Sequence, residues 1–336
     1  MTNTLIVSAF AIFCFYLSSI IGYKLDFLDH PNTRKIHSQP VPYTGGLGLI
    51  LSFFFVIWVL YFDLILLNII FTSFFIFIIG FIDDKYKINV GSRILFQFLI
   101  IFFFINSYNL EIKYIFNLGE QFKLELGGLS LIFTILCTSF LINAFNYSDG
   151  LDGLIATQTI FILLTLVLFQ FYYYKIVNYD LLYLLLPLFL FLLFNYKLFI
   201  FPKLFLGNGG STMLGFIISF IFIYYGYHAD FNIDPELLIW SLSFIVFEFV
   251  STNLSRLRRN KPLFKPGHDH IHFILLKKFK SALRVNIIIF LINILFLLIG
   301  FFSFLFGDFV SLTSFISIFF IYYFSRERLL ENSKKN

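Results

Sequence analysis

Pairs of aspartates stand where long apolar segments of this sequence give way to short polar ones. Asp83 and Asp84 close one apolar segment, and Asp149 and Asp152 lie in the polar run 143–154 between two others. Paired carboxylates can hold Mg²⁺, which takes one or two carboxylates together with phosphate oxygens. One of the aspartates could instead act as a general base.

Each pair also has a plain structural interpretation. Asp83 and Asp84 could begin a solvated loop balanced by Lys85 and Lys87. The two Asp-Gly pairs of the second run are ordinary turn makers. We favour function for this run, because a simple turn needs one such pair and not two together with Asn143 and Asn146. If the next helix begins here, the spacing of three places Asp149 and Asp152 on one side of its first turn.

A glycine-rich segment, residues 205–215, precedes another apolar run and contains Asn208, Gly209 and Ser211. Glycines ahead of a helix N-terminus allow a phosphate to approach the backbone closely. Small residues also let membrane helices pack tightly, and this segment alone does not separate the two interpretations.

A basic loop, residues 256–272, holds Arg258 and Arg259 and three of the six histidines, His268, His270 and His272. The arginines could simply orient the chain or touch anionic lipid. Zinc is a poor fit because no cysteine lies nearby. Binding of a diphosphate accounts better for the clustered histidines.

Composition shows what must position these groups. Of the 336 residues, 59% are hydrophobic and only 13% are charged, against about 25% charged in soluble domains. We therefore predict an all-α polytopic membrane protein with 10 or 11 transmembrane helices and one integral membrane domain over residues 1–336. The candidate spans are 4–23, 46–62, 65–82, 93–108, 128–145, 153–174, 181–199, 211–227, 236–254, 284–306 and 309–324.

Basic residues give the predicted orientation. Of the 24 Lys and Arg, only Lys113, Lys123 and Lys175 fall on one face of the predicted topology. The other face is therefore cytoplasmic, with the N-terminus outside and the C-terminus inside. The predicted active-site loops on that face are 24–45, 83–93, 143–154, 197–211 and 255–283.

Several classes of protein do not fit. The first span lacks a preceding Lys or Arg and a cleavage site, so we expect it to be retained and not to act as a signal peptide. The net charge of +5 does not indicate nucleic acid, because no basic groove alternates with aromatics. Cys14 and Cys137 lie in apolar runs and are expected to behave as small hydrophobes. A transporter is disfavoured because the acidic groups lie at one membrane rim and not at the midplane.

Five motifs in order resemble the polyprenyl-phosphate N-acetylhexosamine-1-phosphate transferases, and the His-x-His loop is similar to the WecA and TagO branch. The matching segments are 34–46, 83–84, 143–154, 207–211 and 270–272. The resemblance implies that a polyprenyl phosphate attacks a UDP-N-acetylhexosamine and releases UMP, at the cytoplasmic face of a bacterial inner membrane. It implies Mg²⁺ as cofactor, with Mn²⁺ as a second candidate, and a homodimer is compatible with it.

Site residues follow from the motifs and the resemblance. The candidate catalytic residues are Asp83, Asp84, Asp149 and Asp152. The candidate metal ligands are Asp84, Asp149, Asp152 and Asn208. The candidate substrate-binding residues are Lys35, His37, Asn143, Asn146, Gly209, Ser211, Arg258, Arg259, His268, His270 and His272.

The sequence also departs from the family's pattern. Asn208 stands where an Asp metal ligand is usual, Glu248 where Asp is common, Gly267-His268 where Asp-Arg is usual, and Phe273 where a last His is usual. Asn208, Gly267 and Phe273 support an alternative, a noncatalytic relative that binds lipid-linked sugars or partners.

Overall fold

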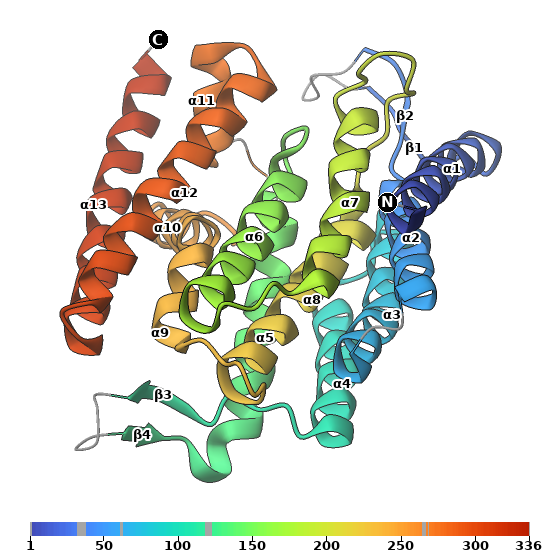
Figure 1. The fold of residues 1–336 in the computed structure, drawn as a ribbon. Helices are drawn as coiled ribbons and strands as arrows, with labels where there is room; N and C mark the ends of the chain where they lie inside the picture. The colour runs from blue at the N-terminus through green and yellow to red at the C-terminus, as the bar shows by residue number, and fades with distance from the viewer. Residues whose placement is uncertain are drawn as a thin grey trace. The chain divides into compact units, whose positions relative to one another are not determined.

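The structure, a computed structural model, describes residues 2–31, 38–60, 63–117, 123–263, 267 and 269–335. These residues form mainly helices, together with two small sheets (Figure 1). The antiparallel strand pairs are β1 (Leu28–Asp29) with β2 (Val41–Pro42) and β3 (Tyr114–Asn117) with β4 (Lys123–Glu125). The helices are α1 (Thr2–Lys24), α2 (Gly45–Leu60), α3 (Leu64–Tyr86), α4 (Val90–Tyr108), η1 (Gly127–Leu129), α5 (Ser130–Ser148), α6 (Leu154–Tyr174), α7 (Tyr179–Asn195), α8 (Gly207–Tyr227), α9 (Pro235–Leu238), η2 (Ile239–Leu242), α10 (Ser243–Arg258), α11 (Ile271–Phe279), α12 (Ala282–Phe304) and α13 (Asp308–Lys335).

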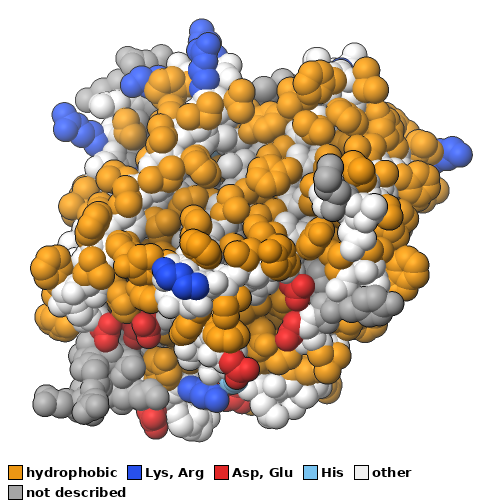
Figure 2. Space-filling model, viewed as in Figure 1, with side chains coloured by type: hydrophobic (Ala, Val, Ile, Leu, Met, Phe, Trp, Pro, Cys, Tyr) orange, Lys and Arg blue, Asp and Glu red, His pale blue; other side chains and the backbone are white. Residues whose placement is uncertain are grey.

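The predicted all-α polytopic membrane class is confirmed. Within the described residues, nine helical segments are long and apolar enough to cross a membrane, and α2 and α7 are shorter apolar helices. Together they coincide with the predicted spans. Hydrophobic side chains also cover most of the face seen in Figure 2, and large ones such as Phe103 and Phe302 are exposed, as expected where lipid is the solvent. The number of spans and the orientation of the termini stay predictions.

Some elements were not predicted. The strand pairs lie in segments that we expected to be loops, and α11 lies inside the predicted loop 255–283. This helix is only nine residues long, too short to register as a span. It forms because Ile271 and Ile274, three residues apart, share one buried face.

Contacts divide the chain into two compact units, each described here by itself. The first unit comprises Met1–Asn109 and Thr138–Ile221, and the second comprises Leu110–Cys137 and Phe222–Asn336. In the first, α1, α2 and α7 pack together and α3 packs against α2 and α4; in the second, α10, α11, α12 and α13 pack together. The prediction of one membrane domain stays a prediction.

The turn between α3 and α4 brings polar residues of the two helices together. Lys87 ends α3 in the left-handed conformation, with φ 49°. Asn89 then caps α4, and its side chain accepts a hydrogen bond from Gly91 N–H at 2.8 Å. Because only three residues separate the helices, the last turn of α3 and the first turns of α4 lie side by side.

Gly80 allows α3 to approach the start of α8 closely. A Cβ at this position would lie 2.7 Å from both the Asn208 carbonyl oxygen and Gly209 Cα. Both are backbone atoms, so neither can rotate away from an added methyl group. Gly80 therefore sets how near Asp83 and Asp84 lie to the glycine-rich segment.

We predict that Gly80→Ala lowers the stability of the protein by about 1–3 kcal/mol, because the methyl group forces α3 and α8 apart. Thermal unfolding in detergent measures the loss. Gly128→Ala is the control, because a Cβ there meets no atom within 4 Å. Equal unfolding midpoints for the two variants would show that the close approach is not required.

Candidate active site

Asp83 is held in a buried ion pair in the first unit. Arg93 Nη1 of α4 donates to Asp83 Oδ2 at 2.8 Å, and both residues are less than a tenth exposed. Arg93 Nη2 lies 3.5 Å from the side-chain oxygen of Asn143, which in turn donates to Gln97. A buried carboxylate needs such a partner to offset its lost hydration. Arg93 therefore fixes the orientation of the Asp83 carboxylate.

Asn208 links Asp83 to Asn146 through a directed pair of hydrogen bonds. Asn208 Nδ2 donates to Asp83 Oδ2 at 3.3 Å, and Asn208 Oδ1 accepts from Asn146 Nδ2 at 2.9 Å. The direction is set by Asp83, because an ionised carboxylate can only accept. Asn146 also donates to Ser211 Oγ at 3.2 Å. Four of the predicted site residues therefore form one hydrogen-bonded group.

Asp84 lies at the start of α8. Its Oδ2 accepts a hydrogen bond from Gly209 N–H at 3.4 Å, and a Cβ on Gly207 would come within 2.9 Å of the same oxygen. The first N–H groups of a helix have no partner within it, and they favour a negative charge. Asp84 supplies that charge here. The predicted contact of this glycine-rich segment with a phosphate stays a prediction.

Asp149 and Asp152 lie in the loop between α5 and α6. Their predicted position on the first turn of a helix is wrong, because Gly153 adopts φ 75° and α6 begins only at Leu154. Lys203 forms an ion pair with Asp152. Neutralised in this way, Asp152 is less available to a cation than its neighbour Asp149.

The end of α7 holds this loop in place. Asn195 accepts a hydrogen bond from Gly153 N–H and donates to the Leu204 carbonyl at 2.8 Å. One side chain therefore joins the α5–α6 loop to the segment that carries Lys203 and leads into α8. Gly153 is required at its position, because a Cβ would overlap the Tyr196 ring and its φ disfavours other residues.

Asp84 and Asp149 have the features of a site for a hard divalent cation. Burial, followed by the negative charges of Asp84 and Asp152, raises the pKa of Asp149 to about 8, although a hydrogen bond from Ser211 opposes the rise. Within the described part of the chain, no three His, Cys, Asp or Glu gather as a metal cluster. Mg²⁺ needs only one or two carboxylates and completes its shell with water and phosphate oxygens. Asp84 and Asp149 could supply those carboxylates, and the predicted Mg²⁺ site stays a prediction.

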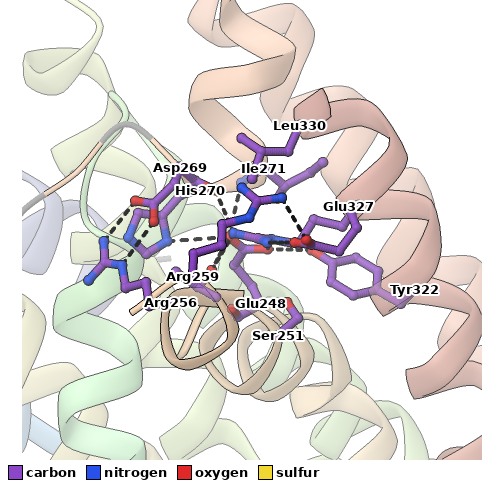
Figure 3. A network of polar contacts seen from close by, with 12 residues as sticks. Glu248, Ser251, Arg256, Arg259, Asp269, His270, Ile271, Tyr322, Glu327 and Leu330 are labelled. Atoms are coloured by element: carbon purple, nitrogen blue, oxygen red, sulfur yellow. Dashed lines mark hydrogen bonds and ion pairs between the residues drawn. The ribbon is translucent and has the colours of Figure 1, made fainter. Parts of the chain in front are cut away.

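The second unit holds the histidines in a separate polar network (Figure 3). Glu248 of α10 accepts from His270 Nδ1 at 3.2 Å, and the rings of His270 and His272 stack 5.3 Å apart. Arg259 Nη2 donates to Glu327 at 2.8 Å. Arg258, by contrast, is exposed at the end of α10.

Three predicted site residues, Lys35, His37 and His268, lie outside the described residues.

The sequence analysis missed polar residues in both the carboxylate cluster and the histidine network. Arg93 is the first residue of a predicted span, and a charge within an apolar segment is a usable signal. Lys203, Asn195, Tyr322 and Arg326 gave no such signal, because their partners are distant in sequence.

We predict that the metal-free protein loses stability as the pH rises from about 5 to about 8, and that Asp149→Asn loses less. The folded protein keeps the Asp149 proton up to about pH 8, whereas the unfolded chain releases it near the ordinary pKa of 3.8. Between these values the folded state binds more protons, so its stability falls with rising pH.

Unfolding midpoints measured in chelator across this range test the effect. Asp230→Asn, which changes an exposed carboxylate, serves as the control and should follow the wild type. Parallel pH profiles for the wild type and Asp149→Asn would contradict the prediction.

Comparisons with known proteins agree with the motifs. The model of the glycosyl transferase family 4 matches residues 66–226. The undecaprenyl-phosphate alpha-N-acetylglucosaminyl 1-phosphate transferase of Escherichia coli K12 is 24% identical over 338 residues, covering 96% of this chain and 89% of the relative. The probable undecaprenyl-phosphate N-acetylglucosaminyl 1-phosphate transferase of Bacillus subtilis 168 is 26% identical over 279 residues, covering 82% and 77%. The family match and these relatives support the resemblance of the chain to the polyprenyl-phosphate N-acetylhexosamine-1-phosphate transferase superfamily and its WecA and TagO branch, whose members are phosphotransferases.

Proposed function

We propose that this enzyme transfers N-acetylhexosamine 1-phosphate from a UDP-sugar to polyprenyl phosphate, in the first membrane step of a cell-surface polysaccharide. The similar proteins of E. coli and B. subtilis carry names for this reaction with undecaprenyl phosphate. The single observation that carries the proposal is the convergence of Asp83, Asp84, Asn146 and Asn208 on the start of α8.

The reaction breaks one phosphoanhydride bond and forms another. An oxygen of the lipid phosphate bonds to the β-phosphorus of the UDP-sugar, and the bond from that phosphorus to the bridging oxygen breaks. The electron pair leaves with UMP, and the sugar 1-phosphate remains on the lipid as a diphosphate. Such transfers depend on positioning and on charge stabilisation more than on covalent catalysis.

The geometry favours Asp84 and Asp149 over Asp83 and Asp152 for contact with phosphates and a cation. Asp83 Oδ2 already accepts from Arg93 and Asn208, and Asp152 is paired with Lys203. Asp84 accepts backbone hydrogen bonds from the start of α8 and has no basic side chain among its described partners. We therefore assign Asp83 and Asp152 to positioning, and Asp84 and Asp149 to direct contact.

Mg²⁺ is the proposed cofactor, with Mn²⁺ as a substitute. Asp84 and Asp149 would hold it, and Asn208 Oδ1 has a second lone pair that could add an uncharged ligand. Bound there, the cation would screen the diphosphate and stabilise the charge that develops on UMP. The chain's own residues keep the two carboxylates oriented and partly shielded from water.

We propose the cytoplasmic face of a bacterial inner membrane as the site of reaction. All but three of the 24 Lys and Arg fall on the predicted cytoplasmic face, and basic residues accumulate in cytoplasmic loops. A UDP-sugar made in the cytoplasm would reach that face directly. The polyprenyl chain of the acceptor would remain in the bilayer.

We predict that the purified protein, in vesicles with undecaprenyl phosphate and Mg²⁺, releases UMP from at least one member of a panel of UDP-N-acetylhexosamines. Asp84→Asn should reduce the rate by about 10²-fold or more, because it removes a charge next to the reacting phosphates. Asp230→Asn should leave the rate unchanged.

The same experiment distinguishes the alternative, a relative that binds lipid-linked sugars without catalysis. The uncharged Asn208 favours that alternative, since it weakens the negative charge of the site. No UMP release from any UDP-sugar, together with retained binding of the lipid diphosphate product, would establish the noncatalytic role.

We predict that Asn208→Asp tightens Mn²⁺ binding roughly ten-fold, equivalent to about 1.4 kcal/mol. The new carboxylate would face Asp83 Oδ2, and a cation would relieve the repulsion between them. Titration followed by electron paramagnetic resonance measures free Mn²⁺ without requiring activity. Asn208→Ala, which removes the amide oxygen, should weaken binding; unchanged affinity in both variants would show that residue 208 is not a ligand.

A further inference from the structure

One oxygen of Glu248 fixes the segment that carries the histidines. Glu248 Oε1 accepts from Ile271 N–H at 2.9 Å, from Thr252 Oγ1 at 3.0 Å and from His270 Nδ1 at 3.2 Å. Ile271 is the first residue of α11, so Glu248 caps this helix from α10. The same oxygen therefore sets both the start of α11 and the direction of the His270 ring.

The other oxygen of Glu248 is held by α13. Glu248 Oε2 accepts from Tyr322 OH at 2.6 Å and from Arg326 Nε at 3.3 Å. Figure 3 shows Glu248 between His270 on one side and Tyr322 on the other. Arg326 also donates to Thr252 Oγ1 at 2.8 Å and to the Asp269 carbonyl. The C-terminal helix thus contacts both the carboxylate and the backbone next to His270.

The donor and the acceptor of each hydrogen bond around Glu248 can be assigned. A carboxylate accepts only, so His270 must donate from Nδ1. Thr252 accepts from Arg326 and therefore donates its own hydrogen to Glu248. Glu248 and Arg326 are each 1% exposed, so water cannot replace a missing partner. A change on α13 should consequently reach His270.

A second ion pair restrains the same segment from the α10 side. Arg256 donates to both oxygens of Asp269, at 2.9 and 2.7 Å, and to the Leu263 carbonyl at 2.6 Å. Burial raises the pKa of Asp269, but this bidentate guanidinium outweighs it and holds the pKa well below its usual range. Asp269 therefore stays charged, and the residue before His270 is held on both sides.

We propose that Tyr322 and Arg326 of α13 are positioning residues for the nucleotide-sugar donor, acting through Glu248 on His270 and the first turn of α11. The inference rests on the proposed function and on the prediction from the sequence that His270 and His272 bind the diphosphate of the donor. It adds that the C-terminal helix determines how well that segment is ordered. Neither residue needs to touch the substrate.

Conservative variants separate this role from simple packing. The Tyr322 ring packs against Phe244, Phe247 and Phe296, and Tyr322→Phe keeps those contacts while removing the hydroxyl. Arg326→Lys keeps the charge and removes the fork of donors. Tyr323→Phe and Arg328→Lys are matched controls on α13, because neither residue is among the described hydrogen-bond partners of Glu248.

Hydrogen exchange of the 269–276 segment, measured without substrate, tests the structural step. We expect Tyr322→Phe and Arg326→Lys to speed exchange of the Ile271 amide roughly ten-fold, because its acceptor is no longer fixed. The matched controls should exchange like the wild type. Equal exchange in all five proteins would overturn the proposal, whether or not the protein releases UMP.

Steady-state release of UMP tests the functional step. In Tyr322→Phe and Arg326→Lys, KM for the UDP-sugar should rise between about ten- and a hundred-fold, with KM for undecaprenyl phosphate unchanged. In a His270→Ala background, Tyr322→Phe should add no further loss, because both act through one contact. Additive losses, or equal rises in both KM values, would overturn the proposal.

A wild-type protein that releases no UMP would overturn the proposed function instead. The hydrogen-exchange rates would still decide whether α13 orders the 269–276 segment.

Discussion

The structure depends on ion pairs that match buried and half-buried carboxylates with basic side chains. Asp83, Asp152, Asp269 and Glu248 each have a basic partner, namely Arg93, Lys203, Arg256 and Arg326 respectively. An ion pair of this kind adds little net stability, but removing one partner leaves a costly uncompensated charge. Each pair therefore fixes the position of one chain segment relative to another, which hydrophobic contacts between helices do not specify by direction.

Against this pattern, Asp84 and Asp149 stand out in the described residues. Asp84 accepts a hydrogen bond from the backbone of Gly209, and the raised pKa of Asp149 reflects burial and the nearby charges of Asp84 and Asp152. Two neighbouring carboxylates repel each other when both are ionised, so binding a cation or a proton lowers their free energy. The ion-paired Asp83 helps to hold the neighbouring Asp84 in place. Asp83 accepts a hydrogen bond from Asn208, in the same first turn of α8 whose Gly209 N–H donates to Asp84.

The spans and the cluster around Asp83, Asp84, Asn146 and Asn208 could be predicted, because apolar length and motif order are local properties of the sequence. The positions of Asp149 and Asp152 could not, because the left-handed Gly153 delays the start of α6 and only the contact with Asn195 shows why. Tyr322 and Arg326 were also beyond reach. They lie at least 74 residues from Glu248, and nothing in their own neighbourhood distinguishes them from an ordinary helix end.

The two departures from the family's pattern at positions 208 and 248 alter the acidic groups in different ways. At position 208 the amide removes one negative charge beside Asp83 and supplies the donor that a carboxylate would lack. At position 248 the charge is kept, and the longer side chain of Glu carries it between α11 and α13, where five donors converge on it. A shorter acid would have to withdraw from one of these helices, because both are in direct hydrogen-bond contact with its two oxygens. The carboxylate cluster of the first unit is therefore less negative than the family's pattern would make it, whereas in the second unit Glu248 anchors the start of α11 to α13.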